Sequence, residues 1–366
     1  MITLSPFVPE DEAAIGAFNA RLAAGGAGFQ FPASLREFTV PTAPGAPLWT
    51  EVWIARDAQA VRGGFLLKHE QLLVAERTLA VGNFQLPLSE GIVDRRFATV
   101  GVSLAQRALA LQPALYSLGM GSITRPLPRL LARLKWTVEE VPFFFRVVHG
   151  GAFARNIRAL QTSARRRTLL RLLATTGAAS LGSFAWRAAA RAGGLAQRPR
   201  VRLLAVDHFD ERADRTLAAC RSDYAALLDR GGAALNIKFP GGDERFRRYV
   251  LEESGRAAGW LLLTVTHLRD HKQFGDLRLG CLVDGLTERH LIAPAVAAAS
   301  RELIRAGVDL IVSNQSHGAW RRALEQNLFL PGPSNFVLAR SPAFVPDIPL
   351  ASLHINRGDG DGPINL

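Results

Sequence analysis

The sequence predicts an α/β protein in which one domain, a mixed and mostly antiparallel sheet flanked by helices, occurs twice. Three observations support this prediction. The 366 residues suit two domains better than one, because single hydrophobic cores stop growing beyond about 250–300 residues. Hydrophobic residues make up 48% and charged residues 21% of the chain, which excludes disorder for most of it. Strand and helix patterns also recur in the same order in the two halves.

Each half opens with a strand and an amphipathic helix. In the first half, residues 9–11 open the helix, whose apolar positions are Ile15, Phe18 and Leu22. Residues 207–214 take the opening role in the second half. The later predicted pairs are the meanders 51–72 and 248–268, the helices 100–111 and 289–307, the short strands 114–120 and 308–314, the helices 128–136 and 320–329, and the final aromatic strands 141–148 and 334–341.

Short matches connect the two series of elements. Residues 64–67 (GFLL) match residues 259–262 (GWLL) at an offset of 195, and Val93-Asp94 matches Val283-Asp284 at an offset of 190. A nearly constant offset over an ordered series of elements indicates a duplicated domain. We therefore divide the chain into an N-terminal domain, an arginine-rich helical connector, a C-terminal domain and a C-terminal tail, with predicted ranges 1–149, 150–200, 201–345 and 346–366. Within the tail, the glycines and aspartates of 358–364 predict a disordered terminus.

Positive charge is concentrated between the two repeats. The net charge is +12, and residues 150–200 hold ten arginines and no acidic residue. A localised positive field attracts the phosphates of anionic lipid, nucleic acid or a phosphorylated ligand. Apolar residues lie between the arginines of 169–192, which favours an anionic membrane surface over nucleic acid as the partner of 150–200. A solvated structural connector is the alternative.

The compartment follows from cysteine usage and hydropathy. Two cysteines exclude a disulfide framework and a cysteine-based zinc cluster. We see neither a secretory signal nor a clean apolar run of membrane-spanning length, so we expect a cytoplasmic protein that meets the inner face of the membrane through 150–200. We predict no metal site, because His267 and His271 lack a third zinc ligand and the aspartates of 358–364 lack the remaining calcium ligands.

The fourth strand of the first half leads into Ala98-Thr99-Val100-Gly101-Val102-Ser103, directly before a helix. This order of elements, over about 1–148 and 201–342, resembles the GNAT superfamily of acyl-CoA N-acyltransferases. The resemblance implies that backbone N–H groups at the start of this helix bind the pyrophosphate of acetyl-CoA or another acyl-CoA, where a glycine lets the phosphates approach. The residues that it assigns to CoA are Val93, Thr99, Val100, Gly101, Val102 and Ser103.

The match to the family's Arg/Gln-x-x-Gly-x-Gly/Ala loop is partial. Ala98 and Ser103 depart from it, so the alternative is that Gly101 only eases a turn between strand and helix. The second half has no glycine at this spacing, and we expect no CoA there.

Acyl transfer to an amine requires a base that takes a proton from the acceptor. The resemblance makes Glu90 and His69 the base candidates, with Glu70 and Glu76 on the third strand as further options. A solvated, outward-facing glutamate is the alternative at each of these strand positions. The tyrosine that often serves as the acid in this family would fall at Leu131 and Leu324, so that acid is missing from both halves.

A dense polar cluster follows the strand 308–314 of the second half. Ligands lie at the carboxyl ends of strands in α/β sheets, so we predict that Asn314, Gln315 and His317 contact the acceptor and that Trp260 stacks on a sugar ring. The alternatives are that Ser316 caps the following helix and that Trp260 packs in the core.

Together these patterns predict an N-acyltransferase, most simply an acetyltransferase, that moves an acyl group from acyl-CoA to an amine of a small-molecule or sugar acceptor. Two alternatives stay open. Fem-type aminoacyl-tRNA-dependent transferases also resemble such a tandem, although they commonly carry a helical arm inserted in one domain, whereas the arginines here lie between the repeats. A non-catalytic GNAT-like module in cell-envelope or polysaccharide biosynthesis would explain the incomplete motif.

Overall fold

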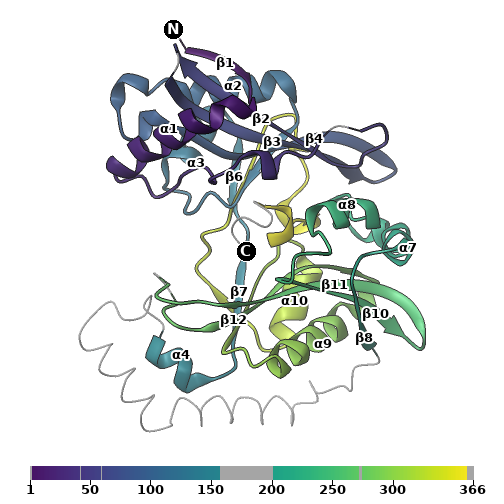
Figure 1. Ribbon diagram of the computed structural model, residues 1–366. Helices are drawn as coiled ribbons and strands as arrows, with labels where there is room; N and C mark the ends of the chain where they lie inside the picture. Colours follow the sequence, from purple (N-terminus) through teal and green to yellow (C-terminus); the bar gives the residue numbers. More distant parts are fainter. Residues whose placement is uncertain (1, 42, 59, 157–200, 272–273, 361–366) are drawn as a thin grey trace.

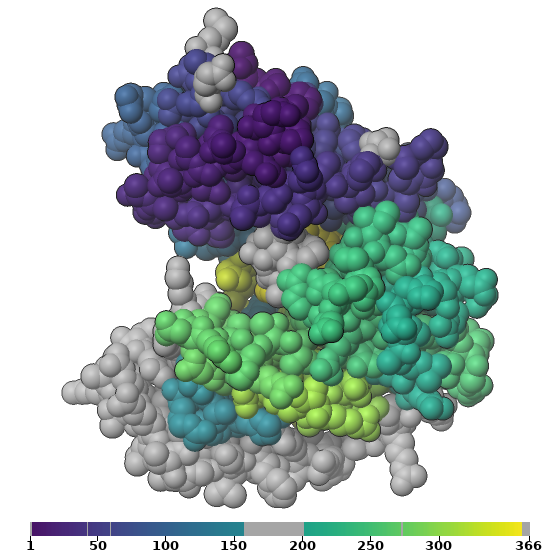
Figure 2. Space-filling view, viewed as in Figure 1, coloured from purple at the N-terminus to yellow at the C-terminus, as the bar shows by residue number. Residues whose placement is uncertain are grey.

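The computed structural model describes residues 2–360 except 42, 59, 157–200 and 272–273. It consists of two halves, each built on one sheet with helices against its faces (Figure 1). We call residues 2–156 the first half and residues 201–360 the second half. In the space-filling view most of the first half lies above the second, and the two meet where the teal surface of the second half reaches the indigo surface of the first (Figure 2).

The first sheet is mixed. Its neighbours β4 and β5 run parallel, and the other neighbours in the main strand order run antiparallel. In spatial order the strands are β1 (Ile2–Pro6), β2 (Trp49–Asp57), β3 (Ala60–Val74), β4 (Arg77–Ser89), β5 (Leu115–Leu118), β15 (Val337–Arg340) and β6 (Thr137–Glu140).

The second sheet repeats this arrangement. Its single parallel pair is β12–β13, and its other neighbours run antiparallel. In spatial order the strands are β8 (Val201–Val206), β10 (Phe246–Glu253), β11 (Arg256–His267), β12 (Arg278–Thr287), β13 (Leu310–Asn314), β7 (Phe143–Val147) and β14 (Leu330–Gly332). The predicted fold class, two mixed and mostly antiparallel sheets flanked by helices, is therefore confirmed.

The two halves exchange one strand each. The strand β7 from the first half lies between β13 and β14 of the second sheet, and β15 from the second half lies between β5 and β6 of the first. In Figure 1 the blue β7 accordingly lies in the lower half of the molecule. Both predicted final strands exist, at 141–148 and 334–341, but each completes the sheet of the other half.

Helices cover the faces of both sheets. In the first half, α1 packs with Val52, Ile54 and Leu66 on one face, while α2 and α3 pack with Phe65 and Leu67 on the other. No helix in the described part of the chain is long and apolar enough to cross a membrane. The helices are α1 (Glu12–Ala24), α2 (Val100–Leu111), α3 (Pro126–Arg133), α4 (Gly150–Asn156), α7 (Glu211–Cys220), α8 (Gly232–Lys238), α9 (Ile292–Arg305) and α10 (Gly318–Gln326).

The parallel pair of each sheet separates after a few residues. The β4–β5 ladder ends at Asn83↔Tyr116, and the β12–β13 ladder covers only 279–281 on β12. Beyond each ladder a serine hydroxyl donates to a carbonyl of the neighbouring strand at 2.8 Å. Ser117 donates to Phe84 O, and Ser313 donates to Leu282 O. We call the gap beyond β4–β5 the first opening and the gap beyond β12–β13 the second opening.

These serine contacts also correct the internal alignment. The two serines lie 196 positions apart (117 and 313) and their carbonyl partners 198 (84 and 282). The match of Val93-Asp94 with Val283-Asp284 at 190 is therefore wrong, because Val93 lies beyond β4 whereas Val283 lies within β12. The second half has a shorter connection between its fourth strand and the following helix, which produced the false match.

Residues 350–360 lie between the two halves. The strand β9 (Ala226–Leu228) pairs with β3 of the first sheet and with β16 (Leu353–His354). Short 3-10 turns at Leu350–Ser352 and Arg357–Asp359 flank β16, and Asp359 is fully buried. The expectation of a disordered terminus over 358–364 is therefore wrong for 358–360, because polar partners from both halves surround these residues. Residues 361–366 lie outside the described residues.

Candidate active site at the junction of the two halves

The first opening leads into a compact loop that ends at α2. Two 3-10 turns, Glu90–Ile92 and Arg95–Phe97, form this loop. Gly91 is required there, because a Cβ at this position would lie 2.5 Å from Phe97 O. At the end of the loop, a Cβ on Gly101 would lie 3.9 Å from Ser89 Cβ at the end of β4. The loop therefore brings the start of α2 next to the opening.

The helix α2 begins with free donors. Its N-cap residue Thr99 makes no side-chain cap, and the first amide bonded within the helix is that of Val102, which donates to Thr99 O at 3.1 Å. The N–H groups of Val100 and Gly101 precede this bond and can serve an anion. A Cβ on Gly101 would meet Leu130 Cδ2 only at an ordinary 3.6 Å. The packing of the chain itself therefore does not require a glycine at this position.

The other residues assigned to CoA by resemblance support the loop. Val100 is fully buried, the side chain of Val93 packs against Gly25, and Ser103 Oγ donates to Thr99 O at 3.3 Å. Their contact with CoA stays a prediction.

Glu90 holds the loop to the rest of the first half. The residue is 4% exposed, and its carboxylate accepts from Arg21 Nε at 2.9 Å and from Arg62 Nη1 at 3.0 Å. Burial opposes ionisation, but these two hydrogen bonds outweigh it and hold the pKa of Glu90 below its usual range. A carboxylate held in this way is a weak base, and its catalytic role stays a prediction.

His69 lies elsewhere on the sheet. Its Nε2 is 2.9 Å from Glu51 Oε1, and its ring stacks on Trp49 with centroids 3.7 Å apart. It pairs in register with Gly82 in the middle of β4, whereas Glu90 lies one residue beyond the end of that strand. The two predicted bases are therefore separated, with His69 on β3 opposite the middle of β4 and Glu90 just beyond the end of β4.

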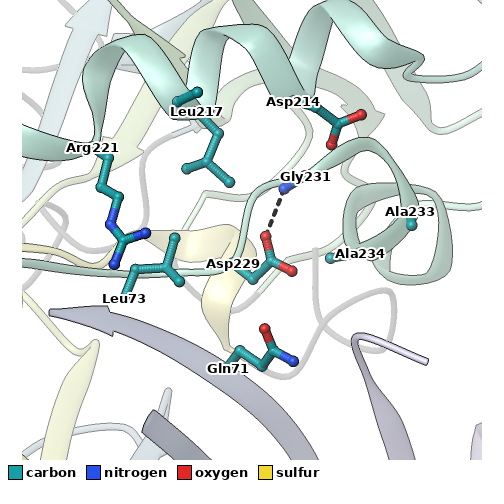
Figure 3. A pocket seen from close by; sticks show the side chains of 10 residues that line it. Gln71, Leu73, Asp214, Leu217, Arg221, Asp229, Gly231, Ala233 and Ala234 are labelled. Atoms are coloured by element: carbon teal, nitrogen blue, oxygen red, sulfur yellow. Dashed lines mark hydrogen bonds between the residues drawn. The ribbon is translucent and has the colours of Figure 1, made fainter. Parts of the chain in front are cut away.

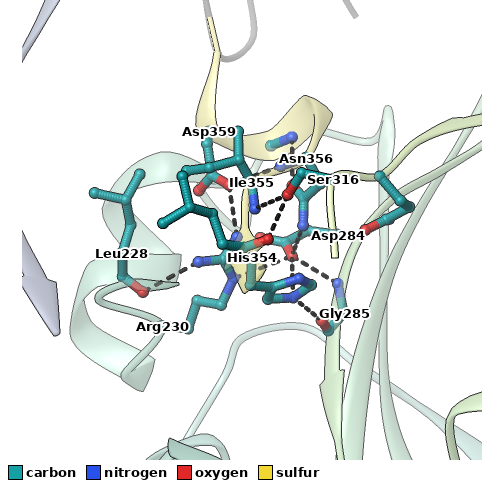
Figure 4. Close-up of polar contacts among 12 residues, drawn as sticks. Leu228, Arg230, Asp284, Gly285, Ser316, His354, Ile355, Asn356 and Asp359 are labelled. Atoms are coloured by element: carbon teal, nitrogen blue, oxygen red, sulfur yellow. Dashed lines mark hydrogen bonds and ion pairs between the residues drawn. The ribbon is translucent and has the colours of Figure 1, made fainter. Parts of the chain in front are cut away.

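The C-terminal segment, which we define as residues 353–360, occupies the second opening. His354 Nε2 is 2.9 Å from Gly285 O, and Asn356 Nδ2 donates to Asp284 Oδ1 (Figure 4). Burial and the nearby Arg230 lower the pKa of His354 well below its usual range, so the ring is neutral and carries its proton on Nε2. The chain itself therefore fills the opening of the second half.

Ser316 also binds this segment. Its N–H donates to Ile355 O at 2.9 Å, and the N–H of Ile355 donates to Ser316 Oγ at 2.8 Å. The N-cap of α10 is His317 instead. The alternative reading of Ser316 as a helix cap is therefore wrong, because its hydroxyl serves the C-terminal segment.

The structure brings together three of the predicted acceptor-binding residues. Asn314 and Gln315 are fully buried, and Asn314 Oδ1 accepts from Arg357 Nε of the C-terminal segment at 3.4 Å. His317 packs on the Tyr224 ring at 4.6 Å, and burial lowers the pKa of this histidine to about 4. All three line the region where the C-terminal segment meets β13, and their contact with an acceptor stays a prediction.

Trp260 lies apart from that group. It is 1% exposed within the core of the second half, and its ring contacts Phe209 edge-on with centroids 5.1 Å apart. This geometry fits core packing, and the predicted stacking of Trp260 on a sugar has no support from it.

A buried ion cluster holds the C-terminal segment in place. Fully buried Arg230 lies 3.2 Å from Asp284 Oδ1 through Nε and 2.6 Å from Asp359 Oδ2 through Nη2 (Figure 4). Burial opposes the charge on Arg230, but the two carboxylates outweigh this effect and raise its pKa. Removing one partner from such a cluster leaves an uncompensated buried charge.

A second buried cluster joins the two halves. Glu70 on β3 accepts from Tyr116 Oη at 2.6 Å and pairs with Lys68 Nζ at 3.0 Å and Lys238 Nζ at 2.6 Å. Burial raises the pKa of Glu70, but the two lysines outweigh it and hold the pKa at about 2. Because Lys238 belongs to α8 of the second half and also lies 3.8 Å from Asp359 Oδ1, the two clusters are continuous.

The first sheet also binds the C-terminal segment through neutral groups. Asn83 Nδ2 donates to Asp359 O at 3.0 Å, and Gln85 Nε2 donates to Gly360 O at 2.9 Å. The segment therefore contacts the fourth strand of both sheets.

A cavity of about 550 Å³ lies between the first sheet, α8 and the C-terminal segment. Four of the polar side chains lining it are at least nine-tenths buried, namely Thr50, Lys68, Gln85 and Lys238. The other polar lining residues, Glu37, Asp243 and Arg245, are more exposed. Most of the wall is apolar and comes from Phe38, Val40, Leu48, Leu66, Ile237 and Pro240. This cavity suits a small molecule with an apolar body and few polar groups.

A smaller pocket of about 310 Å³ also lies between the halves (Figure 3). Gln71 of β3 forms one side of it. Across from it, Asp229 Oδ1 accepts from Gly231 N at 2.8 Å, and Asp214 Oδ1 accepts from Gly232 N at 2.9 Å. Both carboxylates thus hold the start of α8, and we interpret this pocket as part of the packing between the halves.

Among the residues that the structure describes, no group of three or more His, Cys, Asp or Glu side chains is placed to hold a metal ion. Of the arginine-rich connector 150–200, only α4 belongs to the described residues, so its predicted helical structure and contact with an anionic surface concern residues outside them.

Solved structures of similar shape include several N-acyltransferases. A GCN5-related N-acetyltransferase from Anabaena variabilis superposes with a TM-score of 0.54 at 11% identity, over 93% of this chain and 73% of that chain. N-myristoyltransferase from Saccharomyces cerevisiae with bound myristoyl-CoA gives 0.54 at 10% identity, over 93% and 78%. A probable N-acyltransferase from Enterococcus faecalis gives 0.52 at 9% identity, over 94% and 73%. No protein-family model and no curated protein matches the chain.

Each superposition spans both halves. The chain has the GNAT fold, present twice. Identities of 9–11% establish the fold alone, and these matches do not confirm the Fem-type variant. Within the GNAT fold, the helix positions that the resemblance gives to a tyrosine acid are Leu131 on α3 and Leu324 on α10, both fully buried. Neither position can donate a proton.

The main ionic features of this double GNAT fold escaped the sequence analysis. Glu70 was considered only as a base, and Lys68, Lys238, Arg230 and Asp359 were not singled out. The sequence did carry a signal for Lys68 and Lys238, since Lys68 directly follows the apolar residues 65–67 and Lys238 lies between Ile237 and Phe239, and a buried charge needs a partner. Asp359 left none, because its Gly-Asp-Gly-Asp-Gly surroundings are typical of a disordered end.

Proposed function

We propose that the protein is an acyl-CoA-dependent N-acyltransferase whose first half binds the acyl-CoA. The observation that supports this most strongly is the start of α2 beside the first opening, although Asp359 and Gly360 of the C-terminal segment also bind Asn83 and Gln85 next to it. The second opening is occupied by His354 and Asn356 of the C-terminal segment. The first opening leads to the start of α2, where the N–H groups of Val100 and Gly101 precede the first hydrogen bond of the helix.

The choice of donor rests on the fold and on the loop. Proteins with this fold include an N-acetyltransferase and an N-myristoyltransferase crystallised with myristoyl-CoA. A pyrophosphate at a helix N-terminus needs accessible backbone amides, and Gly101 provides them without being required by the packing. As the sequence predicts, we propose that the acyl group is acetyl or longer. We propose that the acceptor is a small molecule or a sugar that carries an amine.

The chemistry asks little of the side chains. The neutral acceptor amine attacks the thioester carbonyl, a C–N bond forms, the C–S bond breaks, and the amine's proton ends on solvent or on the CoA thiolate. Glu90 and His69 stay the candidate bases. Because the arginines hold the pKa of Glu90 low, Glu90 would act by orienting the amine or a water rather than by keeping the proton.

Calorimetric titration with acetyl-CoA and myristoyl-CoA tests the donor site. We expect the protein to bind at least one of them, and we expect the Gly101→Asp variant to bind it at least tenfold more weakly, because the new carboxylate repels the pyrophosphate. The substitution itself suits the fold, since an acidic residue in the first turn favours a helix and the added Cβ meets nothing closer than 3.6 Å.

Gly16→Asp is the matched control. Gly16 is exposed on α1 with no atom within 4 Å of an added Cβ, so this variant should bind acyl-CoA like the unaltered protein. Absence of binding to both thioesters at millimolar concentration would refute the proposal. Unchanged binding by Gly101→Asp would refute the assignment of the pyrophosphate to α2. Binding without release of free CoA thiol across a panel of amines would favour the non-catalytic module.

A further inference from the structure

We propose that the 550 Å³ cavity between the halves binds an acceptor that carries a carboxylate, and that the ammonium group of Lys68 pairs with that carboxylate. The acceptor would then be of the amino-acid type, with an amine, a carboxylate and an apolar body. That this molecule is the acyl acceptor rests on the proposed acyltransferase function, whereas the binding of a carboxylate in the cavity does not.

Among the cations that line the cavity, Lys68 has the least negative charge close to it. Glu70 supplies one negative charge to two ammonium groups, and Lys238 is the closer of them, at 2.6 Å against 3.0 Å for Lys68. Glu70 Oε1, which pairs with Lys68, also accepts a hydrogen bond from the hydroxyl group of Tyr116. Lys238 has a second carboxylate nearby in Asp359, at 3.8 Å. In the described part of the chain, the ion pair of Lys68 is with Glu70 alone.

Burial makes this weak compensation costly. The Lys68 side chain is 9% exposed, and burial together with repulsion from Lys238 lowers its pKa. An ammonium group has three donors, and a buried charge is favourable only when its partners are close and well oriented. A carboxylate entering the cavity would supply the missing charge and further acceptors.

The remaining lining favours a carboxylate with an apolar body. Asp243 and Arg245 in the wall neutralise each other through hydrogen bonds of 2.9 and 3.1 Å, and the acidic lining residue Glu37 is exposed to solvent, which screens its charge. One ammonium with incomplete compensation matches the single charge of a carboxylate, whereas a phosphate dianion would bring a charge that remains unpaired. Thr50 and Gln85 add neutral polar groups, and the apolar walls described above match a hydrocarbon body.

The cavity lies on the strands that lead to the first opening. Its wall includes Leu66 and Gln85, which pair in register at the bulge between β3 and β4. The bulge is followed on β4 by the residues that enter the loop to α2. A molecule with its carboxylate at Lys68 is therefore held on the strand pair that borders the proposed thioester site.

Binding of simple probes to the full chain tests the inference without CoA. Octanoate and 1-octanol differ only in the carboxylate, and we expect octanoate to bind at least tenfold more tightly by calorimetry. In Lys68→Met this preference should disappear, and in Lys68→Arg it should persist. Lys135→Met removes the same charge from an exposed position and should leave the preference unchanged.

Lys68→Met is expected to fold. Methionine matches the length of the lysine stem, and Glu70 keeps Lys238 and Tyr116 as partners. Replacing one member of a buried pair normally destabilises a protein, but here no charge is orphaned. The melting temperature of each variant, measured alongside, verifies that a loss of octanoate binding is not a loss of fold.

The outcomes separate this inference from the proposed function. Equal binding of octanoate and octanol by the unaltered protein, or undiminished octanoate preference in Lys68→Met, would overturn it. Tighter binding of octyl phosphate than of octanoate would overturn the assignment to a carboxylate. If octanoate binds through Lys68 but no acyl-CoA binds, the cavity assignment stands and the proposed function fails. With acetyl-CoA as donor, transfer to phenylalanine but not to phenylalaninol would support both.

Discussion

Asp359 shows how much one side chain near the end of the chain contributes to the fold. Its Oδ2 pairs with Arg230 Nη2 at 2.6 Å, and its backbone carbonyl accepts from Asn83 Nδ2 at 3.0 Å and from Tyr116 Oη at 3.1 Å. The carboxylate therefore binds the second half while the backbone of the same residue binds the first. Asp359 therefore connects the two sheets.

Replacing Asp359 by Asn should destabilise the protein strongly. The amide keeps the shape of the side chain but removes the negative charge, so Arg230 is left with Asp284 as its remaining carboxylate. Breaking a buried pair in this way costs roughly 3–5 kcal/mol. Urea unfolding measures the change, and Asp347→Asn, at an exposed position, is the control that should have little effect. Equal stability of the two variants would mean that Arg230 does not depend on Asp359.

Among the elements, the exchanged strands explain why the halves depend on each other. The strand β15 fills the place between β5 and β6, where Val337, Leu338 and Ala339 are fully buried. Without it, the first sheet would expose the hydrogen-bonding edges of two strands and an apolar gap. The same holds for β7 in the second sheet.

Fragments of the chain should therefore fold together and not apart. We expect residues 1–156 and 201–366 to form a stable complex when co-expressed as separate chains, because each supplies the strand that the other lacks. Each fragment alone should aggregate or remain unfolded by circular dichroism. A stable monomeric fragment 1–156 with dispersed amide resonances would show that the exchange is not needed for folding.

The sequence predicted the elements better than their connections. The predicted helix 100–111 coincides with α2, and the longer strands of each half were predicted because hydrophobic periodicity reports local structure, whereas the short strands β9, β14 and β16 were missed. The exchange of 141–148 and 334–341 could not be predicted, because two repeats with the same pattern fit either sheet equally well. The contacts of Asp359 with Tyr116 and Arg230 could likewise not be predicted, since these residues lie more than 100 positions away in the sequence.

In the candidate site, the sequence predicted where the helix start lies along the chain but not which side chains contact one another. The start of α2 at Val100 and Gly101 was predicted from a resemblance in element order, and the structure places it next to the first opening. The arginines on Glu90 and the burial of Trp260 depend on packing between distant elements. Such contacts leave no local signal, so the roles predicted for these residues stay open to experiment.

At the scale of the molecule, the two halves keep one architecture and treat their openings differently. The strand orders are the same, and Ser117 and Ser313 make the same contact in each. His354 and Asn356 fill the second opening, whereas the first adjoins the start of α2. Under the proposed function, we therefore expect the donor at the first opening alone.

Hydrogen–deuterium exchange with and without acetyl-CoA, or with whichever thioester binds in the titration, tests this asymmetry directly. The account predicts slower amide exchange over residues 85–103, from the end of β4 into α2, and unchanged exchange over the corresponding residues 283–293. Protection confined to 283–293, or equal protection of both stretches, would contradict it.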